Sequence, residues 1–187
     1  MKNTLILHGT GSTSQDNWFP WLKHELEKNS FKVWVPDLPN NNFPSISRWN
    51  KHIFNNKDWH FNQDSILVGH SAGAIEILGL LQALPKDIKV DSCFLVGSFK
   101  NDLGWEQLKD LFIKPFDFEL IKPKANKFIL FHSDDDPHCP LDHAQYLTEK
   151  LDGELIMIPN KGHLSGGTVG DIYNSFPELL ELITKRT

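Results

Sequence analysis

The chain has 187 residues, of which 40% are hydrophobic and 23% are charged, and its formal net charge at pH 7 is −5. This length suits one domain, which we expect to span residues 1–187, and the apolar content exceeds that of disordered chains. Because the net charge is negative and no basic run occurs, nucleic acid and acidic membranes are poor partners. The composition predicts one soluble globular domain.

Two cysteines, Cys93 and Cys139, are too few for a disulfide framework or a cysteine-based zinc site, which favours a reducing compartment. The first apolar run ends at His8 and is too short for a signal peptide. No stretch approaches the ~20 apolar residues of a membrane span. We therefore expect a cytoplasmic protein.

Six short apolar runs rich in β-branched residues predict six strands. The apolar positions are consecutive rather than alternating, which indicates strands that are covered on both faces, as in a parallel sheet. The runs occupy residues 4–7, 32–35, 65–68, 92–96, 127–131 and 154–158.

Segments with helical periodicity alternate with these runs, and a last helix is expected within residues 171–183, where Pro177 should start or kink it. This alternation predicts a three-layer α/β/α sandwich around a mostly or wholly parallel sheet, with an active site at the carboxyl ends of the strands. The aromatic-rich gap at residues 97–126 forms either a small cap or, as we favour, a helix packed on the sheet. The other expected helices occupy residues 18–26, 46–54, 75–81, 105–112 and 141–151.

The strongest chemical signal follows the third run, where residues 69–73 read Gly-His-Ser-Ala-Gly. The pattern G-x-S-x-G between a strand and a helix forms a sharp turn, the nucleophile elbow, that lifts the Ser71 hydroxyl above the sheet. The same turn directs the N–H of Ala72 into that space. The pentapeptide alone is weak evidence, and its weight comes from its position between a strand and a helix.

An acid and a histidine follow later strands in the order Ser, Asp, His, the order found in hydrolases that use this turn. The fifth run is followed by Asp134, Asp135 and Asp136, and the sixth by His163. In a catalytic triad the histidine takes the serine proton and the carboxylate orients the histidine. The residues therefore predict a triad of Ser71, His163 and one of the three aspartates.

The turn after the first run contains two glycines and is expected to supply the second donor of an oxyanion hole. We predict that this donor is the N–H of Thr10, acting beside that of Ala72. The aromatic residues Trp18, Phe19 and Trp21 follow the turn. They could wall an acyl pocket, although helix packing explains them equally well.

These motifs, in this order and spacing, resemble the small serine hydrolases of the retinoblastoma-binding-protein-nine and YdeN family, within the α/β-hydrolase fold. The resemblance implies a minimal α/β-hydrolase fold without a large lid. It also implies hydrolysis of a small ester, thioester or amide through an acyl-enzyme, with no metal or cofactor. The matching segments are residues 7–11, 17–22 and 36–39, Trp49, residues 69–74, Asp136-Pro137 with Pro140, and Gly162-His163.

In this family the triad acid precedes a proline, and a second proline follows three residues later. Only Asp136 meets this pattern here, so the resemblance implies Asp136 as the acid. The residue before the second proline, often aliphatic in related hydrolases, is Cys139. The retinoblastoma-binding motif L-x-C-x-E is absent around both cysteines, so we expect a small-molecule substrate and no specific protein partner.

Two other interpretations are an inactive binding protein that keeps a relic of this site and a dinucleotide-binding enzyme. The dinucleotide enzyme would use the glycine turn at residues 9–11 and Asp37, but Ser14 stands where its third glycine belongs. A third interpretation is a metal site, although the spacing of its ligands matches no defined motif. Its ligands would be His132, Asp134, Asp136, His138 and His143.

Overall fold

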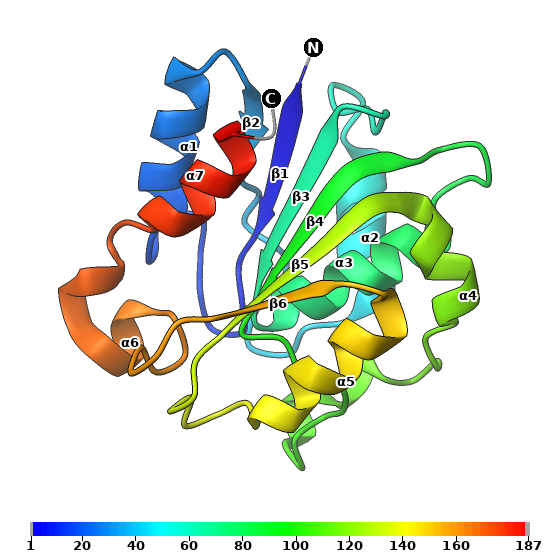
Figure 1. Ribbon diagram of the computed structural model, residues 1–187. Helices are drawn as coiled ribbons and strands as arrows, with labels where there is room; N and C mark the ends of the chain where they lie inside the picture. Colours follow the sequence, from blue (N-terminus) through cyan, green and yellow to red (C-terminus); the bar gives the residue numbers. More distant parts are fainter. Residues whose placement is uncertain (1, 186–187) are drawn as a thin grey trace.

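The computed structural model describes residues 2–185, apart from the side chains of residues 169, 171 and 172, and contains one six-stranded sheet (Figure 1). All neighbouring strands are parallel, and their order is β2-β1-β3-β4-β5-β6, which confirms the predicted sheet. The strands are β1 (Asn3–Leu7), β2 (Lys32–Trp34), β3 (Ser65–His70), β4 (Val90–Val96), β5 (Ala125–His132) and β6 (Glu154–Met157).

Helices cover both faces of this sheet, as expected for a three-layer sandwich. One face carries α1 (Phe19–Lys28) and α7 (Pro177–Lys185), which lie side by side (Figure 1). The other face carries α2 (Ile46–Asn55), α3 (Ala72–Ala83) and α5 (Leu141–Leu151). Pro177 is the first residue of α7, where its missing N–H and fixed φ are tolerated.

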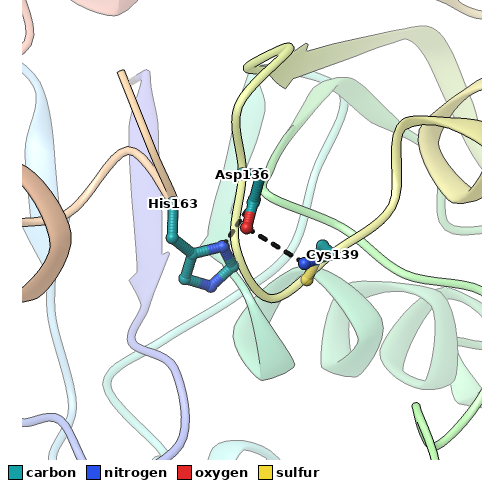
Figure 2. Close-up of side chains that lie close together, drawn as sticks. All are labelled: Asp136, Cys139 and His163. Carbon is teal, nitrogen blue, oxygen red and sulfur yellow. Dashed lines mark hydrogen bonds and ion pairs between the residues drawn. The ribbon is translucent and has the colours of Figure 1, made fainter. Parts of the chain in front are cut away.

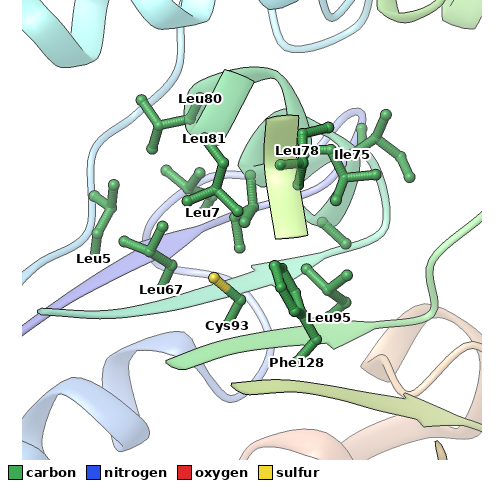
Figure 3. Close-up of a cluster of buried hydrophobic side chains, with 14 of the residues drawn as sticks. Leu5, Leu7, Leu67, Ile75, Leu78, Leu80, Leu81, Cys93, Leu95 and Phe128 are labelled. Atoms are coloured by element: carbon green, nitrogen blue, oxygen red, sulfur yellow. The ribbon is translucent and has the colours of Figure 1, made fainter. Parts of the chain in front are cut away.

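The consecutive apolar residues of the strands divide between two cores. In β1, Leu5 and Leu7 join the core under α3, whereas Ile6 joins the core under α1 and α7. Strands β3 and β4 alternate in the same way, because successive side chains point to opposite faces of a sheet. Figure 3 shows the leucines of α3 packed against the strand residues of the first core.

The segment between β4 and β5 contains only short helices and forms no large lid. The helix expected at residues 105–112 is a 3₁₀ helix, η1 (Glu106–Leu111). Two short elements follow it, α4 (Phe118–Ile121) and η2 (Lys122–Lys124). Phe99 and Leu108 are buried in the core under α3, so this segment mainly packs against the sheet.

The strand order reverses direction between β1 and β3. From β1 the chain moves outward to β2, then returns past β1 to β3 and continues toward β6. Loops after β1 and β3 therefore diverge at this point, which is where open parallel sheets bind their ligands. Within residues 2–185, no helix combines the length and hydropathy needed to cross a membrane.

The first turn of α3 touches the end of β1 directly. A Cβ atom placed on Gly73 would lie 2.3 Å from the Leu7 carbonyl oxygen and 2.7 Å from that of His8. Both neighbours are backbone atoms of the central sheet and cannot rotate away. The contact therefore tolerates only glycine at this position.

We expect Gly73→Ala to lower the free energy of unfolding by about 3 kcal/mol, because the added methyl group forces two buried backbones apart. Urea denaturation followed by circular dichroism measures the change. Gly167→Ala is the matched control, because a Cβ there meets no atom within 4 Å. Equal unfolding midpoints for Gly73→Ala and Gly167→Ala would contradict the close contact.

Candidate active site

Ser71 joins β3 to α3 in a strained turn. Its φ of 54° and ψ of −121° are rare for a residue with a side chain. The Ser71 N–H donates to the Val96 carbonyl at 2.8 Å, which ties the turn to the neighbouring strand β4. Glycines at positions 69 and 73 allow the strand and helix to meet, since a Cβ on Gly69 would lie 2.4 Å from the Gly73 oxygen. The serine is thereby held on a tight turn above the sheet.

His163, in the loop after β6, is hydrogen-bonded to Asp136, in the loop after β5 (Figure 2). The His163 Nδ1 atom lies 2.7 Å from Asp136 Oδ2, and both side chains are buried. Asp136 Oδ1 accepts hydrogen bonds from the backbone N–H groups of His138 at 2.8 Å and Cys139 at 3.0 Å. Burial acts to raise the pKa of Asp136, but the hydrogen bond and charge of His163 outweigh it and lower this pKa. The carboxylate is therefore ionised and orients the imidazole.

The two aspartates that precede Asp136 have a different role. Asp135 Oδ1 accepts from the Gly162 N–H at 2.7 Å, and Asp134 Oδ1 accepts from the Asn160 N–H at 2.8 Å. Both bonds join the loop after β5 to the loop after β6. Of the three aspartates, Asp136 is the one hydrogen-bonded to His163, in agreement with the residue implied by the family resemblance.

Three buried histidines hold the loops around Ser71. His70 Nε2 lies 2.8 Å from the His163 carbonyl, and His132 Nε2 lies 2.9 Å from the Cys139 carbonyl. His8 Nε2 accepts the Leu38 N–H at 2.9 Å, which leaves its Nδ1 to donate to the Gly9 carbonyl at the same distance. These imidazoles connect the loops that carry the candidate residues.

The start of α1 anchors the loop that carries His163. Trp18 Nε1 donates to the Leu164 carbonyl at 3.1 Å, and Asn17 Oδ1 accepts the Gly166 N–H at 3.0 Å. The His163 N–H itself donates to Thr168 Oγ1 at 3.1 Å. Two short elements, α6 (Gly166–Val169) and η3 (Gly170–Tyr173), follow this loop. The position of His163 thus depends on contacts that are remote in sequence.

Gly97, at the end of β4, leaves room for the His163 ring. Its φ is +58°, and a Cβ there would lie 2.9 Å from His163 Cε1 and 3.1 Å from Nδ1. Gly97 was not predicted as a site residue from the sequence. The available signal was a glycine that directly follows a strand, at the edge where the sites of parallel sheets lie.

A cavity of about 530 Å³ opens above Ser71, within the usual size range of small-ligand sites. Ser71, His163 and Thr10 all line it. Thr10 follows Gly9, whose missing side chain lets the turn approach Ser71, because a Cβ on Gly9 would lie 2.9 Å from Ser71 Cβ. Ala72, the first residue of α3, has an N–H with no acceptor within its own helix. Three of the predicted site residues therefore meet at one cavity, with Ala72 next to Ser71.

The three aromatic residues suggested as a pocket wall lie elsewhere. Trp18 and Phe19 are fully buried in the core under α1 and α7, and Trp21 packs against the same core. Helical periodicity explains this position, because the apolar face of α1 turns toward the sheet. The apolar side of the cavity comes instead from the segment between β4 and β5, through Phe99 and Trp105 among others.

One group of side chains in residues 2–185 brings three metal-binding atom types together. Asp136, Cys139 and His163 offer ligand atoms that lie within 4.8 Å of one another. However, the Asp136 and His163 atoms are 2.7 Å apart, whereas two such ligands of one tetrahedral zinc lie roughly 3.3 Å apart. Their spacing fits a shared proton better than a shared metal ion. Of the five residues considered for a metal site from the sequence, Asp136 alone belongs to this group within the described residues.

Comparisons with known proteins identify the family and the fold. A family model described as serine hydrolase matches residues 4–185. YdeN of Bacillus subtilis (strain 168) is 26% identical over 98% of this chain and 95% of its own. The crystal structure of the ydeN gene product superimposes with a TM-score of 0.91 at 25% identity, covering 99% of this chain and 98% of that one.

A second relative and a further solved structure are also similar to this chain. The serine hydrolase RBBP9 of Rattus norvegicus is 26% identical over 94% of this chain and 89% of its own. A meta-cleavage product hydrolase from Pseudomonas fluorescens has a TM-score of 0.71 at 18% identity, covers 100% and 92% of the two chains, and shares the fold. From this family match over nearly the whole chain, the protein belongs to the serine hydrolase family and is a hydrolase with an α/β-hydrolase fold.

Proposed function

We propose that the protein cleaves a small ester, thioester or amide through an acyl-enzyme on a triad of Ser71, His163 and Asp136. The observation that carries this proposal is the 2.7 Å bond between His163 Nδ1 and Asp136 Oδ2 at the cavity that Ser71 lines. The strained backbone of Ser71 supports it further, because a nucleophile elbow requires such a conformation.

In this mechanism the Ser71 hydroxyl attacks the substrate carbonyl carbon while His163 Nε2 accepts the hydroxyl proton. The resulting tetrahedral intermediate collapses, and His163 returns the proton to the departing alcohol, thiol or amine. A water molecule then attacks the acyl-enzyme with His163 again as base, which releases the acid and restores Ser71. Asp136 stays ionised throughout and stabilises the imidazolium.

The negative oxygen of each intermediate is held by the backbone N–H groups of Thr10 and Ala72. Ala72 begins α3, so its amide carries the positive end of the helix dipole. Thr10 lines the cavity beside Ser71, and its turn is fixed by the His8 bonds to Gly9 and Leu38. One such donor contributes roughly 3 to 4 kcal/mol to transition-state stabilisation.

The substrate lies in the cavity above Ser71, and no cofactor takes part in these steps. The cytoplasmic location stays a prediction from the sequence.

We expect Ser71→Ala and His163→Ala each to lower kcat for ester hydrolysis by roughly 10⁶-fold, and Asp136→Asn by roughly 10⁴-fold. The carboxylate acts through the imidazole, so its loss leaves a weaker base in place. Hydrolysis of p-nitrophenyl acetate by each purified variant, first shown to be folded by circular dichroism, measures these effects. Parent-like hydrolysis by folded Ser71→Ala would refute the mechanism.

Covalent labelling provides a test that needs no known substrate. A fluorophosphonate probe should add its mass to the parent protein and leave Ser71→Ala unmodified, because only an activated serine reacts. Intact-mass spectrometry reads the result. An unlabelled, folded parent would favour an inactive binding protein instead.

Gly97→Ala tests whether the His163 ring needs the space left by the missing side chain of Gly97. We expect the rate of fluorophosphonate labelling to fall by roughly 10²-fold, because the new methyl group displaces the imidazole from Ser71. Gly170→Ala is the control, since Gly170 also has a positive φ but a Cβ there meets no atom within 4 Å. A similar loss of rate in both variants would show that backbone strain alone is responsible.

Buried His70 should make the folded protein sensitive to acid. Burial, assisted by the nearby charge of His163, lowers the pKa of His70 to about 3. Between pH 6.5 and 3 the unfolded chain binds a proton at His70 and the folded chain does not, so the free energy of unfolding falls as the pH drops. The expected slope for this group is at most about 1.4 kcal/mol per pH unit.

Denaturation with urea at a series of pH values from 7 to 4 measures this slope. His70→Gln keeps a side-chain donor for the His163 carbonyl but cannot titrate, so its slope should be shallower. Identical slopes for the parent and His70→Gln would contradict the assignment.

A further inference from the structure

One side of the cavity above Ser71 is apolar and aromatic. We call it the aromatic wall. Two of its rings, those of Trp105 and His138, are in contact with each other, and His138 is in contact with His163. The Trp105 ring contacts the His138 ring with centroids 5.7 Å apart, and His138 contacts the His163 ring at 5.2 Å, both edge to face. The wall consists of Phe99, Leu103, Trp105, Leu108 and His138.

The wall is held in place before any ligand binds. Phe99 and Leu108 are buried in the core under α3 and form its base. The turn that presents Trp105 is closed by the Trp105 N–H, which donates to the Asp102 carbonyl at 2.8 Å, and by the Gly104 N–H, which donates to Asp102 Oδ1 at 3.0 Å. An aromatic ring on such a turn can contact a ligand with little ordering cost.

Trp105 lines the cavity and is 40% exposed. A tryptophan ring that remains in contact with water at a ligand cavity gains free energy when an apolar group covers it. His138 offers a similar surface, because burial and the charge of His163 lower its pKa and keep its ring neutral. The two rings form a continuous uncharged face.

The position of this face relative to His163 indicates which part of a substrate it meets. In the proposed mechanism His163 gives its proton to the departing group, so that group lies next to the His163 ring. His138 is the exposed ring in contact with His163, whereas His70 contacts it from the buried side. The face of Trp105 and His138 therefore lies on the leaving-group side.

The charges around the cavity favour an uncharged leaving group. Among the lining side chains that the structure describes, none is lysine or arginine, and Asp16 carries the formal charge. A carboxylate or phosphate on the substrate would therefore lose its hydration without gaining a cation as partner.

From these contacts we propose that Trp105 and His138 determine specificity by binding an uncharged aromatic leaving group, so that the substrates are esters or amides of arylalkyl alcohols or amines. This inference rests on the proposed function, because the leaving-group side is defined by the role of His163. No bond is made or broken by either ring, and both act by contact alone.

The test compares three esters that separate the two sides of the reacting carbonyl. Trp105→Ala should lower kcat/KM for benzyl acetate roughly tenfold, while methyl acetate and methyl phenylacetate change less than roughly twofold. Trp105→Phe should keep most of the preference for benzyl acetate. Phe43→Ala, which removes an exposed aromatic ring outside the cavity, is the matched control and should change none of the three.

Two outcomes of this comparison overturn the proposal. An equal loss for all three esters would mean that Trp105 acts only on the structure of the site. A loss confined to methyl phenylacetate would place the acyl group, not the leaving group, against the wall. The preference for an uncharged leaving group is tested with 4-carboxybenzyl acetate, for which the parent should have a kcat/KM at least roughly tenfold below that for benzyl acetate. Equal kcat/KM values for the two esters would overturn the proposed preference for an uncharged leaving group.

A binding experiment separates this proposal from the proposed function. Benzyl alcohol, the product of benzyl acetate hydrolysis, should show saturation-transfer NMR signals with the parent and with Ser71→Ala, and weaker ones with Trp105→Ala. If the parent neither reacts with fluorophosphonate nor hydrolyses esters but still binds benzyl alcohol through Trp105, the proposed function fails and the aromatic site stands. If the parent is labelled but binds benzyl alcohol equally with and without Trp105, the aromatic site fails alone.

Discussion

The contact between the ends of β1, β3 and α3 is the constraint on which the rest of the site depends. Gly69 and Gly73 let three backbones meet at distances that no side chain would permit. The turn between them holds Ser71 in a conformation that costs roughly 1 to 3 kcal/mol. Burial of β1, β3 and α3 on both sides of the sheet offsets this cost, so the strain is kept where the hydroxyl must be presented.

Hydrogen bonds of buried histidines position the loops around Ser71. The chain contains nine histidines, and several of them connect backbone segments instead of taking part in proton transfer. An imidazole can connect two backbone segments because a neutral ring offers one donor and one acceptor on opposite sides. His8 uses both, between Gly9 and Leu38. The same burial that keeps these rings neutral makes the free energy of unfolding depend on pH.

The strands could be predicted from the sequence because both faces of the sheet are covered. Short continuous apolar runs then indicate buried parallel strands. The proximity of Ser71 and His163 to one cavity could also be predicted, since each follows a strand end at the same edge of the sheet. The choice of Asp136 required the family resemblance, because three adjacent aspartates do not differ in pattern. The structure separates them by their partners, which lie in a different loop.

Other features depend on long-range packing and could not be read from local patterns. Trp18 and Phe19 were considered for the cavity because they follow the glycine turn after β1, although they lie in the core. Gly97 gains its importance only from the ring of His163 above it. Glu76 lies fully buried on α3, where burial raises its pKa well above the ordinary value, and a charged residue in an apolar helix would normally be expected at the surface.

The anchoring of the His163 loop by Trp18 and Asn17 also bears on how the protein is made. These hydrogen bonds join residues that are 146 and 149 positions apart, so the loop acquires its place only after the two ends of the fold have docked. Ser71 and its turn are synthesised long before His163, since chains grow from the N-terminus. Under the proposed mechanism, a nascent chain therefore carries the nucleophile without its base, and hydrolytic competence arises as one of the last events of folding.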